Sequence, residues 1–245
     1  MRVGIVHYGL DRQKGGIGRY ITELTNALVA LGVCVHPLWA GRRPAGAAGE
    51  SLPGSYRLPG LLTLGQVQIA NHVRRLGLDV VHDPTGAMPL TLAPGPRIVT
   101  IHDAIPYIYP RTSTRLDRLI YRGWLPLAIR GAAAVITVSE RSREDILTKL
   151  PAKPNRVITI PEAADRRFRP LPAAAIAPVL HEYGVSQPYI LYVGALESRK
   201  NLPRLLAAYA RLREWSEQWR LVIVGARKWK FSPIFDTVQA LGLEP

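Results

Sequence analysis

Two adjacent cations, Arg199 and Lys200, follow a short apolar run near the end of the 245-residue chain. The run, Tyr189–Val193, has the aromatic and β-branched content of a buried strand. A helix start follows the cations, because Asn201 suits an N-cap and Pro203 fits a first helical turn. The carboxyl end of a parallel strand and the N-terminus of a helix both favour anions. The spacing therefore predicts a phosphate or diphosphate site, although two solvated charges on a loop fit the same residues.

Three glycines, Gly15, Gly16 and Gly18, lie between the first apolar run and a helical pattern that starts near Arg19. Glycines at such a place let the backbone turn tightly and approach a ligand, and the helix N-terminus favours an anion. Their spacing is not the G-x-G-x-x-G of dinucleotide-binding enzymes. The pattern is therefore equally compatible with a ligand loop and with a purely structural turn.

Two His-Asp pairs close apolar runs: His82 with Asp83, and His102 with Asp103. At the carboxyl ends of parallel strands, side chains face the ligand crevice of the sheet. A histidine there can donate a hydrogen bond to a substrate hydroxyl or stabilise developing charge. A histidine that is satisfied within its own loop is the alternative. A metal site made from both pairs lacks a clustered third ligand, so we predict no metal.

These residues are predicted to sit on an α/β scaffold, because strand-like runs alternate with helical patterns along the chain, as in βαβ units with a parallel sheet. The predicted strands are 3–8, 33–39, 80–82, 97–102, 135–138, 157–160, 189–193 and 221–224. The predicted helices are 20–31, 64–76, 114–130, 142–150, 202–215 and 233–241.

Two irregular segments interrupt the alternation. Residues 42–59 are rich in Gly, Ala, Pro and Ser, so we predict a mobile loop. Prolines and arginines break the pattern again at 162–178, where we place a domain boundary. The predicted domains are 1–170, with a complete parallel sheet, and 171–245, which is partial. The second is expected to supply fewer than the roughly five or six strands of a usual doubly wound sheet.

The composition limits the classes of function. A formal net charge of +14 predicts attraction to nucleic acid, anionic lipid or phosphorylated substrates. The arginines are scattered, without the patterns of a nucleic-acid module, so no dedicated nucleic-acid binding is predicted. No apolar stretch approaches the roughly 20 residues of a membrane span, and the N-terminus has no leader pattern, so we expect a cytoplasmic protein. The single cysteine, Cys34, is predicted to be a small buried hydrophobe.

The segment 111–130 mixes leucines with arginines at helical spacing. Such a helix can lie on an anionic membrane, where each exposed arginine contributes about 1 kcal/mol. It can also pack its apolar stripe on the sheet and leave the charges in solvent. Pro126 interrupts the amphipathic face, so packing is favoured. A peripheral contact with the inner face of an anionic membrane stays open.

Five stretches in collinear order resemble family 4 retaining glycosyltransferases of the GT-B fold, especially the mannosyltransferase-like branch. They are GGIGRYITEL, VTIHDAIPYIYP, AVITVSERSREDI, ITIPEAADRRFRP and YILYVGALESRKNLPRLLAAY. The resemblance implies two Rossmann-like domains, with a nucleotide-sugar donor between them and an acceptor held mainly by the first domain. It covers nearly the whole chain, and the last stretch is the most specific.

The resemblance also implies roles for individual residues. Gly15 and Gly16 match the loop that approaches the donor phosphates and the reacting sugar. His102, which is followed by Asp103, matches the strand-end histidine that contacts the sugar near the anomeric centre. Arg199 and Lys200 match the cations on the diphosphate, which make a metal unnecessary in the family.

The chain departs from the family pattern at two places. Ala195 stands where many members carry an arginine, although the mannosyltransferase-like branch tolerates small residues there. The E-x7-E motif that holds the donor sugar and ribose does not occur in the sequence, and neither Glu197 nor Glu217 lies in its context. In the family that motif follows the position of Pro245, so we expect a chain that is truncated before it.

The sequence therefore predicts a retaining glycosyltransferase that moves a hexose, with mannose from GDP-mannose as the expected donor, to a glycan or lipid-linked acceptor. Two alternatives stay open. One is a truncated fragment that acts at most as a binding module. The other is a nucleotide-sugar epimerase or a phosphorylase that shares the GT-B fold.

Overall fold

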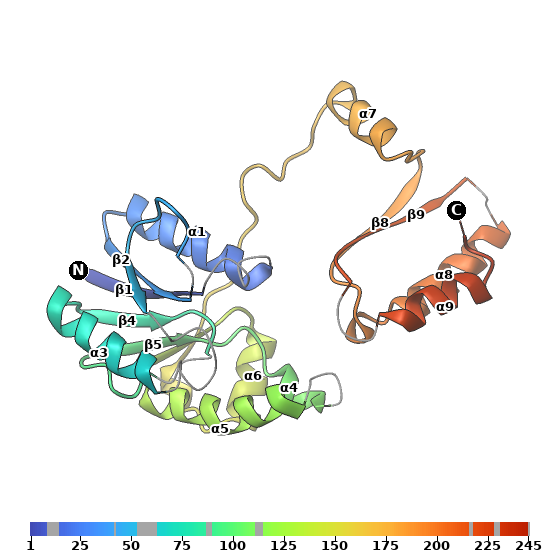
Figure 1. Cartoon of the computed structure of the whole chain (residues 1–245). Coiled ribbons are helices and arrows are strands. Elements are labelled where there is room, and N and C mark those ends of the chain that lie inside the picture. The colour runs from blue at the N-terminus through green and yellow to red at the C-terminus, as the bar shows by residue number, and fades with distance from the viewer. Residues whose placement is uncertain are drawn as a thin grey trace. The chain divides into compact units, whose positions relative to one another are not determined.

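A computed structural model describes residues 1–8, 15–41, 43–52, 63–86, 90–110, 115–215, 218–227 and 231–244. The chain divides into two compact units, residues 1–163 and 164–245, each described here by itself (Figure 1). The boundary between the two units, at residues 163 and 164, lies within the irregular segment 162–178.

The first unit is built on a parallel sheet in which seven strands are described, in the order β3-β2-β1-β4-β5-β6-β7. Helix α1 covers one face of this sheet, and α3 and α5 cover the other (Figure 1). The elements are β1 (Arg2–Tyr8), α1 (Gly16–Ala30), β2 (Cys34–Ala40), β3 (Glu50–Leu52), α3 (Leu64–Leu76), β4 (Val80–Asp83), β5 (Arg97–Thr100), α4 (Ile105–Ile108), α5 (Arg115–Gly131), β6 (Ala134–Thr137), α6 (Glu140–Lys149), the short 3₁₀ helix η3 (Pro154–Arg156) and β7 (Val157–Thr159).

Strand β1 is central in this sheet because it pairs with β2 on one side and with β4 on the other. Its residues Ile5 and Val6 are fully buried, as expected for a parallel strand with helices on both faces. A Cβ at Gly4 would come within 2.7 Å of Leu78 Cδ1, so the glycine lets the segment after α3 pack against β1. That helix ends at Gly77, whose φ of +57° suits a residue without a side chain.

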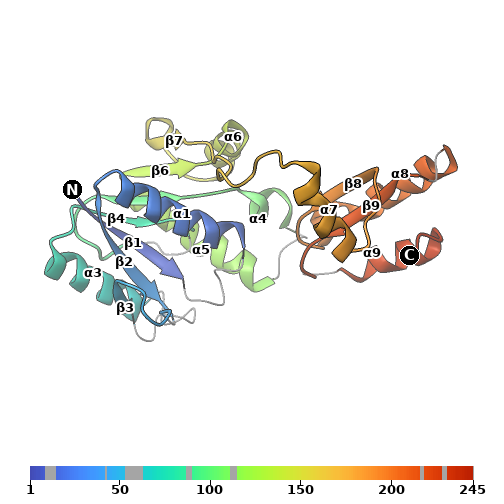
Figure 2. The same ribbon diagram turned by 90° about the horizontal axis from the view of Figure 1, so that it is seen from above.

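The second unit contains a parallel pair of strands. Its last two helices lie below the pair in Figure 1, and its first helix lies in front of the pair in the view from above (Figure 2). Its elements are α7 (Ala173–Glu182), β8 (Tyr189–Val193), the 3₁₀ helix η4 (Ser198–Lys200), α8 (Leu202–Trp215), β9 (Arg220–Val224) and α9 (Ser232–Ala240). Leu196, Leu202, Leu206 and Ile234 form its buried core. On the strands, Leu191, Val193 and Val224 are about half exposed or more.

The α/β class and the parallel arrangement are confirmed, and every predicted strand corresponds to an observed one. Three local predictions are wrong. Part of the predicted loop 42–59 forms β3, which pairs in parallel with β2. Part of the predicted break 162–178 belongs to α7. Cys34 is exposed and not buried, because it starts β2, where its Sγ lies 3.3 Å from His36 Nε2.

Helix α5 packs one side on the sheet, as the packing alternative for the segment 111–130 predicted, while contact of this helix with a membrane stays a prediction and residues 111–114 lie outside the described residues. Leu125, Ala128 and Ile129 are buried in a core cluster with strands β5 and β6. Two leucines of the same helix, Leu119 and Leu127, are instead exposed. None of the helices in the described part of the chain combines the length and the apolar content that a bilayer crossing requires.

Candidate donor-binding and catalytic site

The strand order of the first unit reverses between β1 and β4, which places a switch point at the middle of the sheet. From β1 the chain runs on to one side through α1 and β2, and the later strands β4 to β7 extend to the other side. In open α/β sheets, ligands bind in the crevice outside the carboxyl ends of the strands at such a point. The residues that follow β1, β4 and β5 are therefore the first to consider.

Gly15 and Gly16 begin α1, which follows β1. Gly15 is the N-cap residue, and its φ of −177° is ordinary extended backbone that any residue can adopt. A Cβ built on either glycine has no described heavy atom within 4 Å. Neither backbone conformation nor packing against the described residues therefore requires glycine at these positions. With respect to the described residues, the space beside these two glycines is open, as a ligand loop needs.

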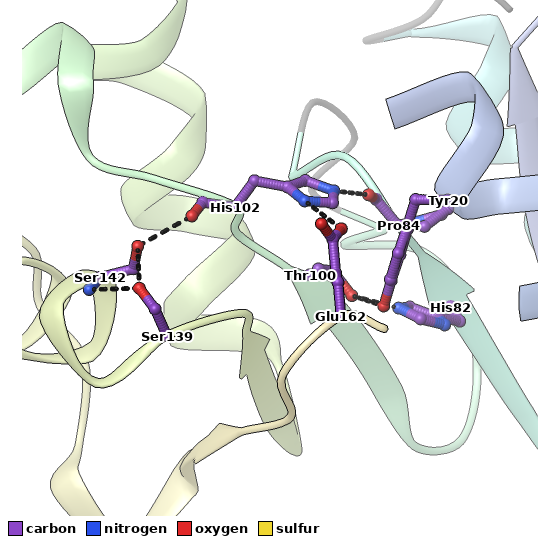
Figure 3. Close-up of polar contacts among 8 residues, drawn as sticks. All are labelled: Tyr20, His82, Pro84, Thr100, His102, Ser139, Ser142 and Glu162. Carbon is purple, nitrogen blue, oxygen red and sulfur yellow. Dashed lines mark hydrogen bonds and ion pairs between the residues drawn. The ribbon is translucent and has the colours of Figure 1, made fainter. Parts of the chain in front are cut away.

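His102 follows β5 and is held through both ring nitrogens (Figure 3). Its Nε2 lies 3.0 Å from the carbonyl oxygen of Pro84. A carbonyl oxygen only accepts, so Nε2 carries the proton. Its Nδ1 lies 3.6 Å from Glu162 Oε1, and the His102 side chain is 17% exposed. Nδ1 is therefore the ring atom that can exchange a protein contact for a ligand.

The backbone of His102 is fixed from another direction. Its carbonyl oxygen accepts a hydrogen bond of 3.0 Å from Ser142 Oγ. Ser142 lies in the first turn of α6, where its backbone N–H donates to Ser139 Oγ, the N-cap side chain of that helix. Capping of this kind stabilises a helix start by about 1 kcal/mol. The start of α6 therefore positions the strand-end histidine.

Tyr20 connects α1 to the same site. Its ring meets the His102 ring edge-on, with centroids 4.8 Å apart. Its hydroxyl lies 3.3 Å from Thr100 Oγ1, the last residue of β5. Burial raises the pKa of Tyr20, the Thr100 hydrogen bond lowers it and the nearby Glu162 charge raises it, so the phenol stays protonated. The helix that starts at the glycines is thus packed directly against His102 (Figure 3).

The side chains of the first His-Asp pair, His82 and Asp83, form hydrogen bonds within the protein. His82 is 5% exposed and its Nε2 lies 2.8 Å from Thr100 Oγ1. Burial, with a smaller contribution from His102, lowers the pKa of His82 to about 4. Asp83 is fully buried and accepts hydrogen bonds from the backbone and hydroxyl of Thr85. Both side chains are therefore buried, and His82 is satisfied by a residue of the neighbouring strand β5 and not within its own loop.

Asp103 is exposed, and its Oδ1 accepts a 3.0 Å hydrogen bond from the backbone N–H of Ile105 at the start of α4. Its predicted part in donor binding stays a prediction. Among the residues that the structure describes, no group of three His, Cys, Asp or Glu side chains lies close enough together to hold a metal ion.

In the second unit, Arg199 and Lys200 lie on η4, between the carboxyl end of β8 and the first residue of α8. Arg199 forms an ion pair with Glu197 two residues earlier, and both side chains are partly exposed. Asn201, with a φ of +53°, separates the cations from α8. The structure thus places the cations at a strand end and beside a helix N-terminus, as the sequence predicted.

The comparison with known families agrees with this arrangement. Residues 14–168, more than half of the chain, match the family described as Glycosyltransferase Family 4. The chain belongs to Glycosyltransferase Family 4. Residues 181–245 match a second family, Glycosyl transferases group 1. The two matched segments lie in the two compact units, apart from a few residues at 164–168.

Two relatives of this family 4 chain have names that state a sugar. O-antigen chain mannosyltransferase B of Escherichia coli is 29% identical over 163 residues, which cover 65% of this chain and 42% of that protein. Alpha-D-kanosaminyltransferase of Streptomyces kanamyceticus is 28% identical over 135 residues, which cover 53% of this chain and 35% of that protein. The match therefore spans less than half the length of either relative.

Solved structures share the fold of this family 4 chain. Sucrose-phosphate synthase from Thermosynechococcus elongatus superposes with a TM-score of 0.72 at 17% identity, over 99% of this chain and 68% of that one. HepE from Anabaena, in complex with UDP and glucose, gives a TM-score of 0.72 at 15% identity, over 100% of this chain and 67% of that one. At these identities the likeness concerns the fold alone.

Sequence reasoning about the family 4 chain missed the residues that hold His102. Tyr20, Pro84 and Glu162 lie 18 to 82 positions away from it along the chain, and no local pattern links them. Ser142 had a local signal, because the sequence SERS contains two serines at the spacing of an N-cap and its third helical residue. Only the fold brings these four residues to one histidine.

Proposed function

We propose that this protein is a retaining glycosyltransferase that moves a hexose from a nucleotide diphosphate sugar to a glycan or lipid-linked acceptor. The observation that carries the proposal is the meeting of the α1 N-terminus and His102 at the switch point of the first sheet, through the 4.8 Å ring contact of Tyr20. Ligands of open α/β sheets collect at that place. Membership of Glycosyltransferase Family 4 supports the reaction class.

In this proposal the chemistry needs charge stabilisation more than proton transfer. The bond from the anomeric carbon to the diphosphate breaks, a bond from the acceptor oxygen forms on the same face, and the acceptor proton passes to the departing diphosphate. Negative charge grows on the diphosphate while the sugar becomes oxocarbenium-like. Arg199 and Lys200 stabilise the departing charge, so that no metal is required, and His102 contacts the sugar through Nδ1.

The donor in this proposal is GDP-mannose. Support comes from the relative named as a mannosyltransferase, which is 29% identical over 163 residues. The second relative is named for a different sugar, and the HepE structures contain UDP, glucose or UDP-glucose. The nucleotide and the sugar are therefore the first variables that an experiment should separate.

The test uses the purified chain with sugar-labelled GDP-mannose and, in parallel, UDP-glucose, each with and without a glycan or lipid-linked acceptor. We expect label in the acceptor and free GDP only when both substrates are present, and an unchanged anomeric configuration in the product by NMR. An inverted configuration would overturn retention. Conversion of the donor without any acceptor would instead identify an epimerase.

Transfer from UDP-glucose but not from GDP-mannose would overturn the donor assignment and leave the reaction class intact. The same reactions also test the binding-module alternative. A chain that binds nucleoside diphosphate in calorimetry but transfers no sugar with either donor would contradict the assignment of the enzyme activity to these 245 residues.

We also propose that the protein works in the cytoplasm at the inner membrane face. The net charge of +14 supports such a contact, because each basic residue near an anionic surface contributes about 1 kcal/mol. Sedimentation with phosphatidylserine-containing vesicles at low and high salt tests this. Binding that does not change with salt would remove the electrostatic explanation.

A further inference from the structure

The two strands of the second unit end in the same way. Val193–Ala195 and Val224–Ala226 both read V-G-A, and basic residues follow each tripeptide. The strands are parallel, with Val193 paired to Val224. The pairing continues past both strand ends, because Gly194 donates to Val224 O at 2.9 Å and Leu196 bridges to Arg227. The backbone of Arg227 therefore lies at the carboxyl edge of the two-stranded sheet, beside the loop that carries Arg199 and Lys200.

The glycines of the two tripeptides lie against each other. A Cβ at Gly225 would come within 1.7 Å of the carbonyl oxygen of Gly194. No side chain fits at Gly225 without moving the neighbouring strand. At these two glycines the carboxyl edge of the strand pair therefore consists of backbone alone. The side chains that line this edge come from the residues that follow the glycines.

The Arg227 guanidinium is held by two aromatic rings. Its Cζ lies 5.6 Å from the ring centroid of Phe231 and 4.9 Å from that of Phe235. These two rings meet edge-on, with centroids 6.0 Å apart, at the start of α9. A guanidinium over an aromatic face is attracted by the ring quadrupole, and this contact orients the group without neutralising its charge.

Arg199 and Arg227 differ in their partners. Arg199 is paired with the carboxylate of Glu197. Within the described ranges of the chain, no carboxylate forms an ion pair with Arg227, which is exposed. Arg227 thus presents a full, oriented positive charge at the same strand edge. Its planar fork matches the geometry of phosphate oxygens.

We propose that Arg227 is a further donor-binding residue, whose guanidinium contacts the diphosphate of the nucleotide sugar alongside Arg199 and Lys200. This inference rests on the proposed glycosyl transfer, because it concerns the same ligand. It adds the end of β9 to a site that the sequence pattern located only at the end of β8. Phe231 and Phe235 are then positioning residues, which act through the arginine.

The test is calorimetric titration of the 245-residue chain with GDP, UDP and inorganic pyrophosphate. Arg227→Ala should weaken binding of all three by about tenfold, because the lost contact is to phosphate. Arg227→Lys should recover part of the affinity, since it keeps the charge but not the planar fork. Phe235→Leu should weaken binding by a smaller factor, because it leaves the charge and removes one ring beneath it.

Arg220→Ala is the matched control. Arg220 is an exposed arginine at the amino end of the same strand, so its removal changes the net charge equally. We expect unchanged affinity for this variant. Equal affinities of the wild type, the Arg227→Ala variant and the control would overturn the inference, and so would equal weakening by both substitutions, which would indicate a non-specific effect of net charge.

The inference and the proposed function fail in different ways. If the wild-type chain binds none of the three ligands, the proposed donor site itself is wrong. If Arg199→Ala with Lys200→Ala abolishes binding while Arg227→Ala leaves the affinity unchanged, the donor site stands and only the role of Arg227 is wrong. A lower Tm for Arg227→Ala with unchanged affinity would mean that the residue only covers the two phenylalanines.

Discussion

The two units hold their candidate residues in different ways. In residues 1–163, His102 is largely buried and contacts segments from four separate parts of the chain. In residues 164–245, Arg199 and Lys200 are exposed on a short turn, and the ion-pair partner of Arg199 is two residues away. The first site therefore depends on tertiary structure, and the second on local sequence.

The buried core is also more extensive in the first unit than in the second. The first unit has two buried clusters around a parallel sheet in which seven strands are described. The second has one smaller cluster, and the side chains of Leu191, Val193 and Val224 on its strands are largely exposed. Parallel strands are normally buried on both faces. A substitution at the largely buried His102 should therefore affect folding and ligand together, whereas one on the η4 turn should affect the ligand alone.

The largest expected effect separates ligand from fold in the second unit. Arg199→Ala combined with Lys200→Ala should lower sugar transfer on the order of 10²- to 10³-fold, because the diphosphate loses its fixed positive charges. The Tm should stay within about 1 °C, since both side chains are exposed and surface ion pairs contribute little. Initial rates and thermal unfolding measure the two quantities.

Arg211→Ala with Arg220→Ala is the control for that double variant. It removes the same charge from exposed positions on α8 and at the amino end of β9. We expect normal transfer. A double variant at 199 and 200 that is no slower than this control would contradict the role of the two cations.

Acid should destabilise the first unit before the second. Burial lowers the pKa of His7 to about 4, and burial with the His102 charge lowers that of His82 to about 4. Unfolded histidine takes up a proton near pH 6.5, so stability is complete above 6.5 and falls as the pH drops to 4. Each histidine accounts for at most about 3 kcal/mol of this loss.

Hydrogen exchange at pH 7 and pH 4.5 measures this order of unfolding region by region. The only histidine of the second unit is His181, which is exposed, so a variant with glutamine there should show the wild-type pH dependence. His7→Gln should reduce the pH dependence of the first unit. If the second unit lost hydrogen-exchange protection at a higher pH than the first unit, the expected order of acid unfolding would be contradicted.

His102→Ala should reduce turnover on the order of 10- to 100-fold, an intermediate effect, because a hydrogen bond to substrate is lost. Because the side chain also contacts Pro84 and Tyr20, some stability should be lost as well. His72→Ala, on α3, is the control with an expected wild-type rate. Stability that falls as steeply as turnover would instead favour a purely structural histidine.

The smallest effect should come from Gly15→Ala and Gly16→Ala. No described atom lies within 4 Å of the added methyl group, so the Tm should be unchanged or slightly higher. Nucleoside diphosphate affinity should fall by roughly tenfold if the ligand occupies that open space. Titration calorimetry measures the affinity. A lower Tm with unchanged affinity would assign these glycines to a structural turn.

Much of the fold was predictable because it follows from local patterns. Periodicity located every strand except β3, which has only three residues in a segment without alternation. Helix α7 was missed because Pro178 lies inside it and prolines surround it. Cys34 was misjudged because an apolar run predicts a strand but not which of its residues face solvent.

The sequence by itself determined the strand ends at which His102, Arg199 and Lys200 lie, because strand and helix signals act over a few residues. It also carried the family motifs. Tertiary structure alone decided that His82 is buried, that Tyr20 and Glu162 meet His102, and that Arg227 stands at the edge beside Leu196. These contacts join segments that lie far apart in the sequence. The burial and the strand pairing that create them exist only once the sheet has folded.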